Sequence, residues 1–158
     1  MKSNLLAVLA MVTTSVALAS AAEVPYPTGY REWHHVKSMV IEEGHPLFAS
    51  FGGIHHIYAN EKALKGYRSK KFPDGAVIIF DLRDAVRADH AINEGQRKVI
   101  GVMHKNAKKF AATGGWGFEA FADGDPTRGV VGQNAVSACF ACHQPQKTHD
   151  YTFSRLRD

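Results

Sequence analysis

The only two cysteines of the 158-residue chain lie close together near its C-terminal end, and a histidine follows the second. The spacing Cys139, Cys142, His143 is the attachment pattern of a c-type haem. It predicts one covalent haem c, with thioether bonds from Cys139 and Cys142 and His143 as an axial ligand of the iron. The alternatives for such a pair are a disulfide and a thioredoxin-like redox site, and the adjacent histidine favours haem.

The ligand on the other face of the iron decides what such a protein does. A strong sixth ligand makes an electron-transfer cytochrome, whereas an open face binds a small molecule. After residue 21 the methionines are Met39 and Met103, and packing in strands explains both. The other histidines include the neighbouring pairs His34-His35 and His55-His56, which leave a metal-binding cluster as an alternative, and also His45, His90, His104 and His149.

The N-terminal residues have the pattern of an export signal. Lys2 is followed by an apolar run from Leu5 to Leu18 and by the small residues Ala19-Ser20-Ala21. This pattern predicts a cleaved secretory signal at 1–21, a periplasmic location, and one haem domain at 22–158; an uncleaved anchor is the alternative. No later stretch is long and apolar enough to span a membrane.

The charge of the chain is modest. Its formal net charge is +4, and the basic residues are scattered apart from the short runs "RSKK" at 68–71 and "HKNAKK" at 104–109. We therefore expect no nucleic-acid partner, and no membrane partner after signal cleavage.

Most of the chain has the pattern of short strands rather than helices. Segments rich in β-branched and aromatic residues, separated by Gly, Pro, Asn or Asp, predict strands at 33–41, 53–59, 75–82, 98–105 and 115–121. The short connections predict a mainly β (α+β) fold: an antiparallel, roughly five-stranded sheet with a few short helices.

Two helices are predicted beside these strands. The first covers 60–67, begins at Asn60 as its cap and ends near Gly66, before a turn at "FPDG", 72–75. The second follows a Gly- and Asp-rich loop at 122–134, has Asn134 as its cap, and carries the haem attachment motif.

Several stretches are familiar when they are read together in order. The segments "YREW", "GGIHHIYAN", "KFPDGAVIIFDL", "KKFAATGGWGFEAF", "CFACH" and "YTFSR" resemble the cytochrome P460 family over nearly the whole of 22–158. The resemblance implies a periplasmic β-sheet haem c protein, usually a homodimer, with a proximal histidine and a vacant distal face.

The family has two branches, and the residue at position 80 separates them. In the hydroxylamine-oxidising cytochromes P460 a lysine is cross-linked to the porphyrin, and alignment on "FPDG" places Phe80 there. The second cap position falls on Phe51. The chain therefore resembles the other branch, the cytochromes c′-beta, whose phenylalanine-capped pocket binds nitric oxide and carbon monoxide.

The chemistry of a phenylalanine cap agrees with this choice. Phe80 shares a strand face with Ala76 and Ile78, and its ring offers no hydrogen bond to a bound ligand. Such a pocket disfavours dioxygen more than nitric oxide or carbon monoxide. Hydroxylamine oxidation requires a base, and the nearest carboxylate, Glu119, shares a face with Gly117 and Phe121 and is interpreted as a solvated surface group.

We therefore favour nitric oxide trapping or carriage over hydroxylamine or nitric oxide oxidation, and over electron transfer with a redox partner protein. Two contacts of the haem stay open. The acceptor for the second ring nitrogen of His143 is not named by the sequence. Candidate cations for the haem propionates, each equally explained as a surface charge, are Arg31, Arg68, Lys70, Lys71 and Arg155.

Overall fold

The structure is a computed structural model that describes residues 24–157. The predicted signal at 1–21 lies outside the described residues. Within the described part, no helix has both the length and the apolar character needed to cross a membrane.

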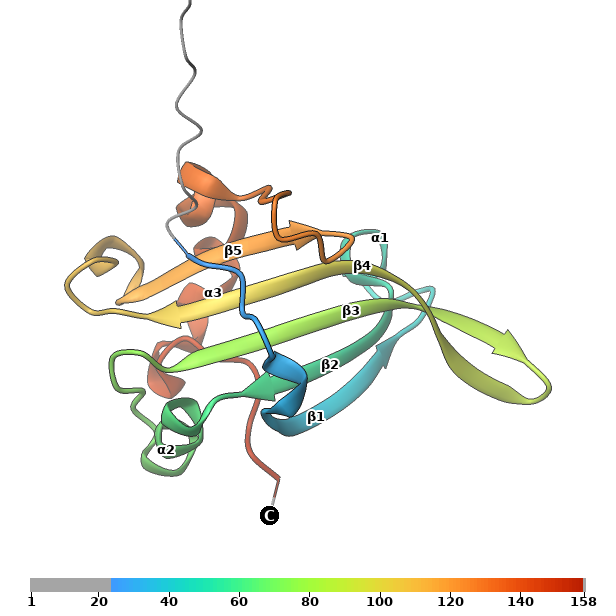
Figure 1. Cartoon of the computed structure of the whole chain (residues 1–158), viewed down its shortest axis with the longest axis horizontal. Helices are drawn as coiled ribbons and strands as arrows, with labels where there is room; N and C mark the ends of the chain where they lie inside the picture. The colour runs from blue at the N-terminus through green and yellow to red at the C-terminus, as the bar shows by residue number, and fades with distance from the viewer. Residues whose placement is uncertain (1–23, 158) are drawn as a thin grey trace, which may run out of the picture.

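One antiparallel sheet forms the centre of the molecule (Figure 1). Its spatial order, β1-β2-β3-β4-β5, is the order along the chain, so each strand pairs with its sequence neighbour. The mainly β, α+β fold class is confirmed. The strands are β1 (His34–Ile41), β2 (Gly53–Ala59), β3 (Val77–Ala88), β4 (Ala91–Lys105) and β5 (Trp116–Ala122). The helices outside the haem motif are η1 (Tyr30–Glu32), α1 (Phe48–Phe51), α2 (Glu61–Ser69) and η2 (Ala111–Thr113).

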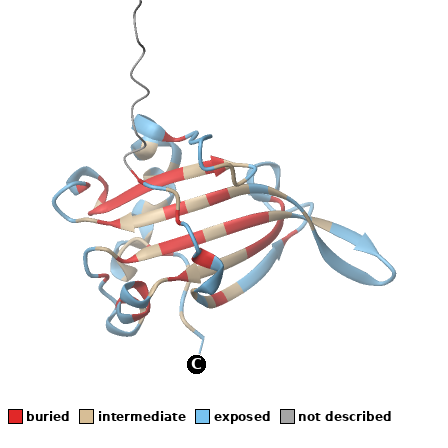
Figure 2. Cartoon of the chain, in the orientation of Figure 1, coloured by how far each residue is buried: buried red, intermediate tan, exposed pale blue. Residues whose placement is uncertain are grey.

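Strands β3 and β4 run further than the sequence predicts. They continue past 82 and before 98 as a hairpin that projects beyond the other strands and is largely exposed (Figures 1 and 2). The hairpin turns at Asp89 and His90, both with positive φ, as a two-residue mirror-image turn requires. Its sequence is too polar for strand alternation to be visible, which explains the missed extension.

Asn60 caps helix α2 as predicted. Its Oδ1 accepts from the Ala63 N–H at 2.9 Å and from the Val77 N–H at 3.1 Å, so the cap also joins the helix to β3. Gly66 does not end the helix. It lies within α2, which ends at Ser69, and a Cβ at this position would come within 2.3 Å of the Phe72 ring.

Different parts of the chain cover the two faces of the sheet. The N-terminal segment crosses one face, here called the N-terminal face, and the C-terminal helices lie behind the other, here called the helix face (Figure 1). The core of the N-terminal face comprises Val24, Tyr30, Ile79, Ile100, Val102, Phe110 and Phe121. The core of the helix face comprises Val36, Ala59, Ala63, Leu64, Phe72, Ala76, Ile78, Trp116 and Phe118.

A buried carboxylate holds the N-terminal segment on its face. Asp81 is 2% exposed; it accepts from the Tyr30 hydroxyl at 2.6 Å and from Arg97 Nε at 2.8 Å. Burial alone raises the pKa of Asp81, but the bonds from Arg97 and Tyr30 outweigh it and leave the pKa below its usual value. The ionised carboxylate is therefore part of the folded state.

Replacing Asp81 with Asn should lower the free energy of unfolding at pH 7 by about 3 kcal/mol, because Arg97 loses its charged partner. The pKa of Asp81 is lowered from 3.8 on folding. Its contribution is therefore complete above that pH and is lost as the pH falls through the folded-state pKa. Urea unfolding of both proteins should show a constant difference near neutrality that shrinks below about pH 4. A difference that does not change with pH would contradict this assignment.

Candidate haem site

The haem motif lies in a chain of short helical turns that follows β5. These are η3 (Gly132–Asn134), η4 (Val136–Phe140, a π-helix), α3 (Ala141–His143) and η5 (Gln144–His149). The predicted Asn134 cap is wrong. Asn134 lies inside η3, and η4 begins after Ala135 without a side-chain cap. Packing of Cys139 and Phe140 on the helix-face core places this segment instead.

The two cysteines differ in their surroundings. They form no disulfide with each other. Cys139 is half-buried against the sheet, and burial raises its pKa to about 11, whereas Cys142 is exposed. The motif therefore has one thiol facing the protein and one facing outward.

His143 has a defined tautomer. Its Nδ1 lies 2.8 Å from the carbonyl oxygen of Tyr151. A carbonyl can only accept, so Nδ1 carries the proton and Nε2 is left with a lone pair for a metal. Burial lowers the pKa of His143, which favours this neutral form. The Tyr151 carbonyl is the acceptor that the sequence leaves unnamed.

Aromatic rings hold the imidazole from two sides. The centroid of the Phe118 ring lies 5.1 Å from that of His143, and the Phe153 centroid lies 4.9 Å away. Phe118 belongs to the helix-face core, whereas Phe153 is 57% exposed. His143 therefore stands at the edge of the core, half-buried between a packed ring and an exposed one.

The helix face next to this motif is incompletely covered. Ile57, Phe80, Gly101 and Met103 lie there and are half-buried, and Met39 is 47% exposed. Apolar side chains in strands are usually buried on a face that carries helices. A flat apolar group with an iron to ligate fits the residues present: the open apolar surface, the two thiols and the free Nε2 of His143.

The two predicted cap residues are brought together. The ring centroids of Phe51 and Phe80 lie 5.9 Å apart at an interplanar angle of 88°, an edge-to-face contact. Phe51 comes from α1, a short helix that the sequence analysis does not predict. Phe80 shares its strand face with Ala76 and Ile78, both in the helix-face core, as predicted.

A buried histidine supports this pair of rings. His55 is 3% exposed; its ring centroid lies 4.5 Å from that of Phe80, and its Nε2 donates to the Phe51 carbonyl. Its neighbour His56 points to the opposite face, where it contacts Ser38 and Glu94. The two rings thus diverge as strand alternation predicts. Residues 24–157 contain no group of three or more His, Cys, Asp or Glu side chains that could hold a metal ion, so the histidine-cluster alternative is wrong there.

The interpretation of Glu119 as a solvated surface group is wrong. The residue is 4% exposed, because the loop after β5 folds back over it. Its Oε1 accepts from the Ala120 and Val131 N–H groups at 2.9 and 2.8 Å, and its Oε2 accepts from the Gly132 N–H at 3.2 Å. Both oxygens of the carboxylate hold backbone in place.

Of the candidate cations for propionates, Arg31 stacks over Tyr30 in the core of the N-terminal face, away from the motif. Arg68, Lys70 and Arg155 line a hollow of about 320 Å³ between α2 and the C-terminal residues. Lys71 is exposed and does not line that hollow.

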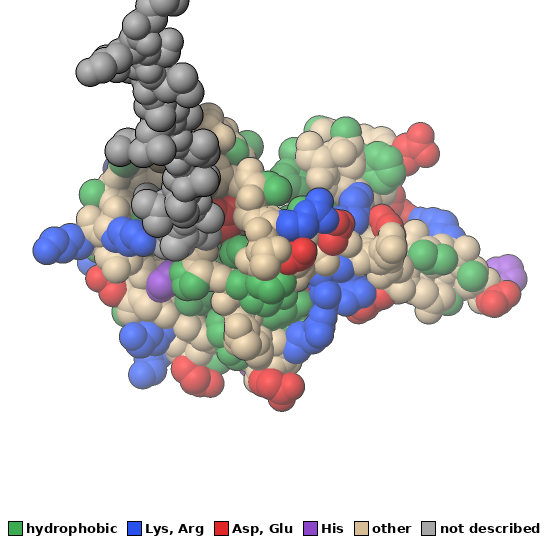
Figure 3. Space-filling view, turned by 45° about the horizontal axis from the view of Figure 1, so that its top comes forward, with side chains coloured by type: hydrophobic (Ala, Val, Ile, Leu, Met, Phe, Trp, Pro, Cys, Tyr) green, Lys and Arg blue, Asp and Glu red, His purple; other side chains and the backbone are tan. Residues whose placement is uncertain are grey.

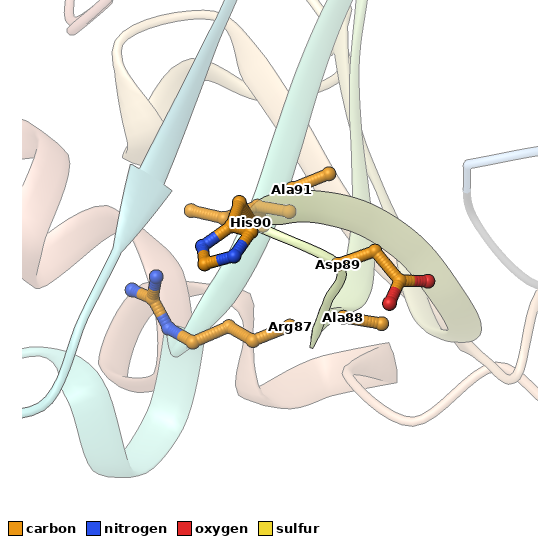
Figure 4. Close-up of a pocket in the computed structure, with 6 residues that line it drawn as sticks. Arg87, Ala88, Asp89, His90 and Ala91 are labelled. Carbon is orange, nitrogen blue, oxygen red and sulfur yellow. The ribbon is translucent and has the colours of Figure 1, made fainter.

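Another hollow, of about 510 Å³, lies at the tip of the β3–β4 hairpin (Figure 4). It is formed by Arg87–Ile92, which are exposed, and Figure 4 shows the Arg87 and His90 side chains on one side with Asp89 turned away from them. These residues are distant in sequence from the Cys139–His143 motif, and none of the three motif residues lines this hollow. In the view of Figure 3, charges of both signs are interspersed over the molecule and continue onto the hairpin.

A half-buried apolar sheet face beside a Cys-x-x-Cys-His segment fits the attachment of a haem group. The family model for cytochrome P460 matches residues 27–154, which is most of the chain. The chain belongs to the cytochrome P460 family. Among curated proteins, none matches it significantly. Family membership implies a haem cofactor and supports a c-type haem protein.

Glu119 should act as an anchor for the loop that leads into the haem motif. Replacement with Ala leaves the Val131 and Gly132 N–H groups without their acceptor, and the free energy of unfolding should fall by about 2–4 kcal/mol. Glu119→Gln keeps one acceptor oxygen and should lose roughly half as much. Urea unfolding measures both effects, and limited proteolysis at 123–132 should become faster in the Ala variant. An Ala variant as stable and as resistant as the parent would show that the loop does not depend on the carboxylate.

Proposed function

We propose that this protein binds nitric oxide, and also carbon monoxide, at a single covalent haem c with a five-coordinate iron, and that it traps or carries nitric oxide. Cys139 and Cys142 form the thioether bonds, and His143 is the axial ligand. Phe51 and Phe80 cover the distal face. The observation that supports this most strongly is the edge-to-face contact of the two rings on the sheet face that adjoins the motif.

The distal side chains, Phe51 and Phe80, have no hydrogen-bond donor for a bound gas. When bound, the haem iron supplies the coordination site for a diatomic gas. Phe51 and Phe80 exclude water and offer no donor to the gas, and the Nε2–H of His55 is engaged by the Phe51 carbonyl. Dioxygen, which gains from a hydrogen bond, is then disfavoured relative to nitric oxide and carbon monoxide.

The proximal side chains hold the ligand nitrogen in place. The hydrogen bond to Tyr151 keeps the proton of His143 on Nδ1, and the rings of Phe118 and Phe153 limit rotation of the imidazole. Nε2 is therefore available without a proton having to leave.

Hydroxylamine oxidation is the enzymatic alternative, and two features argue against it. Position 80 is a phenylalanine, which has no amine for a porphyrin cross-link. Glu119 has both oxygens engaged by backbone N–H groups, so it is not a free base.

Electron transfer with a six-coordinate iron is the other alternative. It requires Met39, Met103 or a histidine on the iron. Met39 and Met103 lie in β1 and β4, and Met103 packs on the helix-face core, while His55 is engaged by the Phe51 carbonyl and the Phe80 ring. We propose an open iron face. We further propose a signal at 1–21 that exports the protein to the periplasm, and one haem domain at 22–158. The family resemblance implies a homodimer, and a redox partner protein belongs to the same proposal.

Truncating the distal cap should speed gas entry. Phe80→Ala removes the ring that Phe51 and His55 contact, and carbon monoxide should bind the ferrous protein about tenfold faster, a barrier lower by about 1.4 kcal/mol. Flash photolysis measures the rate. Phe48→Ala is the matched control, because Phe48 lies in the same helix as Phe51, is 42% exposed and packs on Gly52. Equal rates in the Phe80 variant and the parent would mean that Phe80 does not cover the iron.

The two cysteines should hold the haem covalently. In the parent protein, haem should stay with the chain after acid–acetone extraction, because thioether bonds survive denaturation. Changing Cys139 and Cys142 together to Ser should release all of it into the organic phase. Haem that is extracted from the parent would refute covalent attachment, and haem retained by the double variant would reveal another bond to the chain.

A further inference from the structure

We propose that Lys105 and Asp150 are positioning residues for the proximal histidine. They fix the direction of the Tyr151 carbonyl, and that carbonyl sets the orientation and the hydrogen bonding of His143. This inference rests on the proposed function only in that His143 ligates the iron.

The acceptor for His143 lies in an unusual backbone corner. Asp150 and Tyr151 are consecutive non-glycine residues with φ values of 49° and 64°, in the left-handed region. This conformation is unfavourable for residues with a Cβ and persists only where surrounding contacts hold it. The direction of the Tyr151 carbonyl depends on those contacts.

The carboxylate of Asp150 provides two of them. Its Oδ1 accepts from Lys105 Nζ at 2.6 Å, and its Oδ2 accepts from the Phe72 N–H at 2.8 Å. Lys105 is 7% exposed at the end of β4, and its Nζ also donates to the Gly114 carbonyl at 3.0 Å. Removing either charge leaves the other one buried and unpaired, so the pair acts as one unit.

Contacts to the backbone and the ring of Tyr151 complete the corner. Trp116 Nε1 donates to the Asp150 carbonyl at 2.8 Å, and the Tyr151 N–H donates to the Gln146 carbonyl at 2.9 Å. The Tyr151 ring lies against Gly114, where a Cβ would come within 2.2 Å of it. Hydrogen bonds thus join the corner to β4 through Lys105, to β5 through Trp116, to the segment before β3 through Phe72, and to η5 through Gln146.

This arrangement matters for the iron because the proximal donor is tuned through its other nitrogen. A short, well-directed hydrogen bond from Nδ1 makes the imidazole a stronger electron donor at Nε2. An acceptor that can swing away weakens that effect. The ion pair therefore controls the electronic character of the iron from the far side of the Tyr151 peptide, without touching the haem ligand itself.

Resonance Raman spectroscopy of the haem-loaded ferrous protein tests this directly. Asp150→Asn and Lys105→Met should each lower the iron–histidine stretching frequency and raise the reduction potential, because the Nδ1 hydrogen bond weakens. Asp123→Asn is the matched control: Asp123 also has a positive φ, 56°, and also pairs with a cation, here Arg128, but on the exposed surface. It should leave both quantities unchanged.

A purely structural role would give a different result. If both variants lower the midpoint of thermal unfolding but keep the parent frequency and potential, the positioning role is overturned. Should Lys105→Met fail to fold, Lys105→Arg keeps the charge with altered geometry and should show a smaller shift in the same direction; an unchanged frequency and potential there would overturn the inference. If the parent shows no iron–histidine band because a second ligand occupies the iron, the proposed gas site fails, and the potential alone then decides the positioning claim.

Discussion

The hydrogen bond from His143 Nδ1 to the Tyr151 carbonyl is the contact on which the site depends. It joins a short helix, whose few residues could not hold a side chain rigidly, to a corner that is fastened to the sheet. It also decides which nitrogen is free for a metal. Without it the motif would still have its cysteines, but the imidazole would have neither a fixed tautomer nor a fixed direction.

The sheet explains why an open site can coexist with a stable fold. On the N-terminal face, the packed segment before β1 and the buried Asp81 network complete a core of the chain's own side chains. On the helix face, only the part around Trp116 and Phe118 is packed by the C-terminal turns. Farther along this face, Ile57, Phe80, Gly101 and Met103 are half-buried. The N-terminal face is therefore packed, whereas the helix face has half-buried apolar side chains that a flat apolar group could cover.

The haem motif, the cap of α2 and the five strands can be predicted from the sequence, because each depends on residues that are close together in the chain. The motif at 139–143 is local, Asn60 is a local cap, and the five strands have apolar alternation that shows where a face is buried. The sequence does not predict the hairpin extension of β3 and β4, because its residues are polar and both of its faces are exposed.

The remaining errors involve contacts between distant parts of the chain. Strand alternation places Glu119 on a face but cannot show that residues 129–132 fold over it. In the same way, the acceptor for His143 depends on a corner held by Lys105 and Trp116, which are far away in sequence. The pairing of Phe51 with Phe80 was expected from the family resemblance and not from any local pattern.

The central claim is that one face of the iron is open beneath an apolar cap. The optical spectrum of the purified, dithionite-reduced protein, recorded before and after anaerobic addition of nitric oxide, tests it most directly. An open iron face predicts broad high-spin bands that shift when the gas is added. A sharp low-spin α band that is unaffected by nitric oxide would show that a side chain already occupies the second face, and would contradict an open iron site.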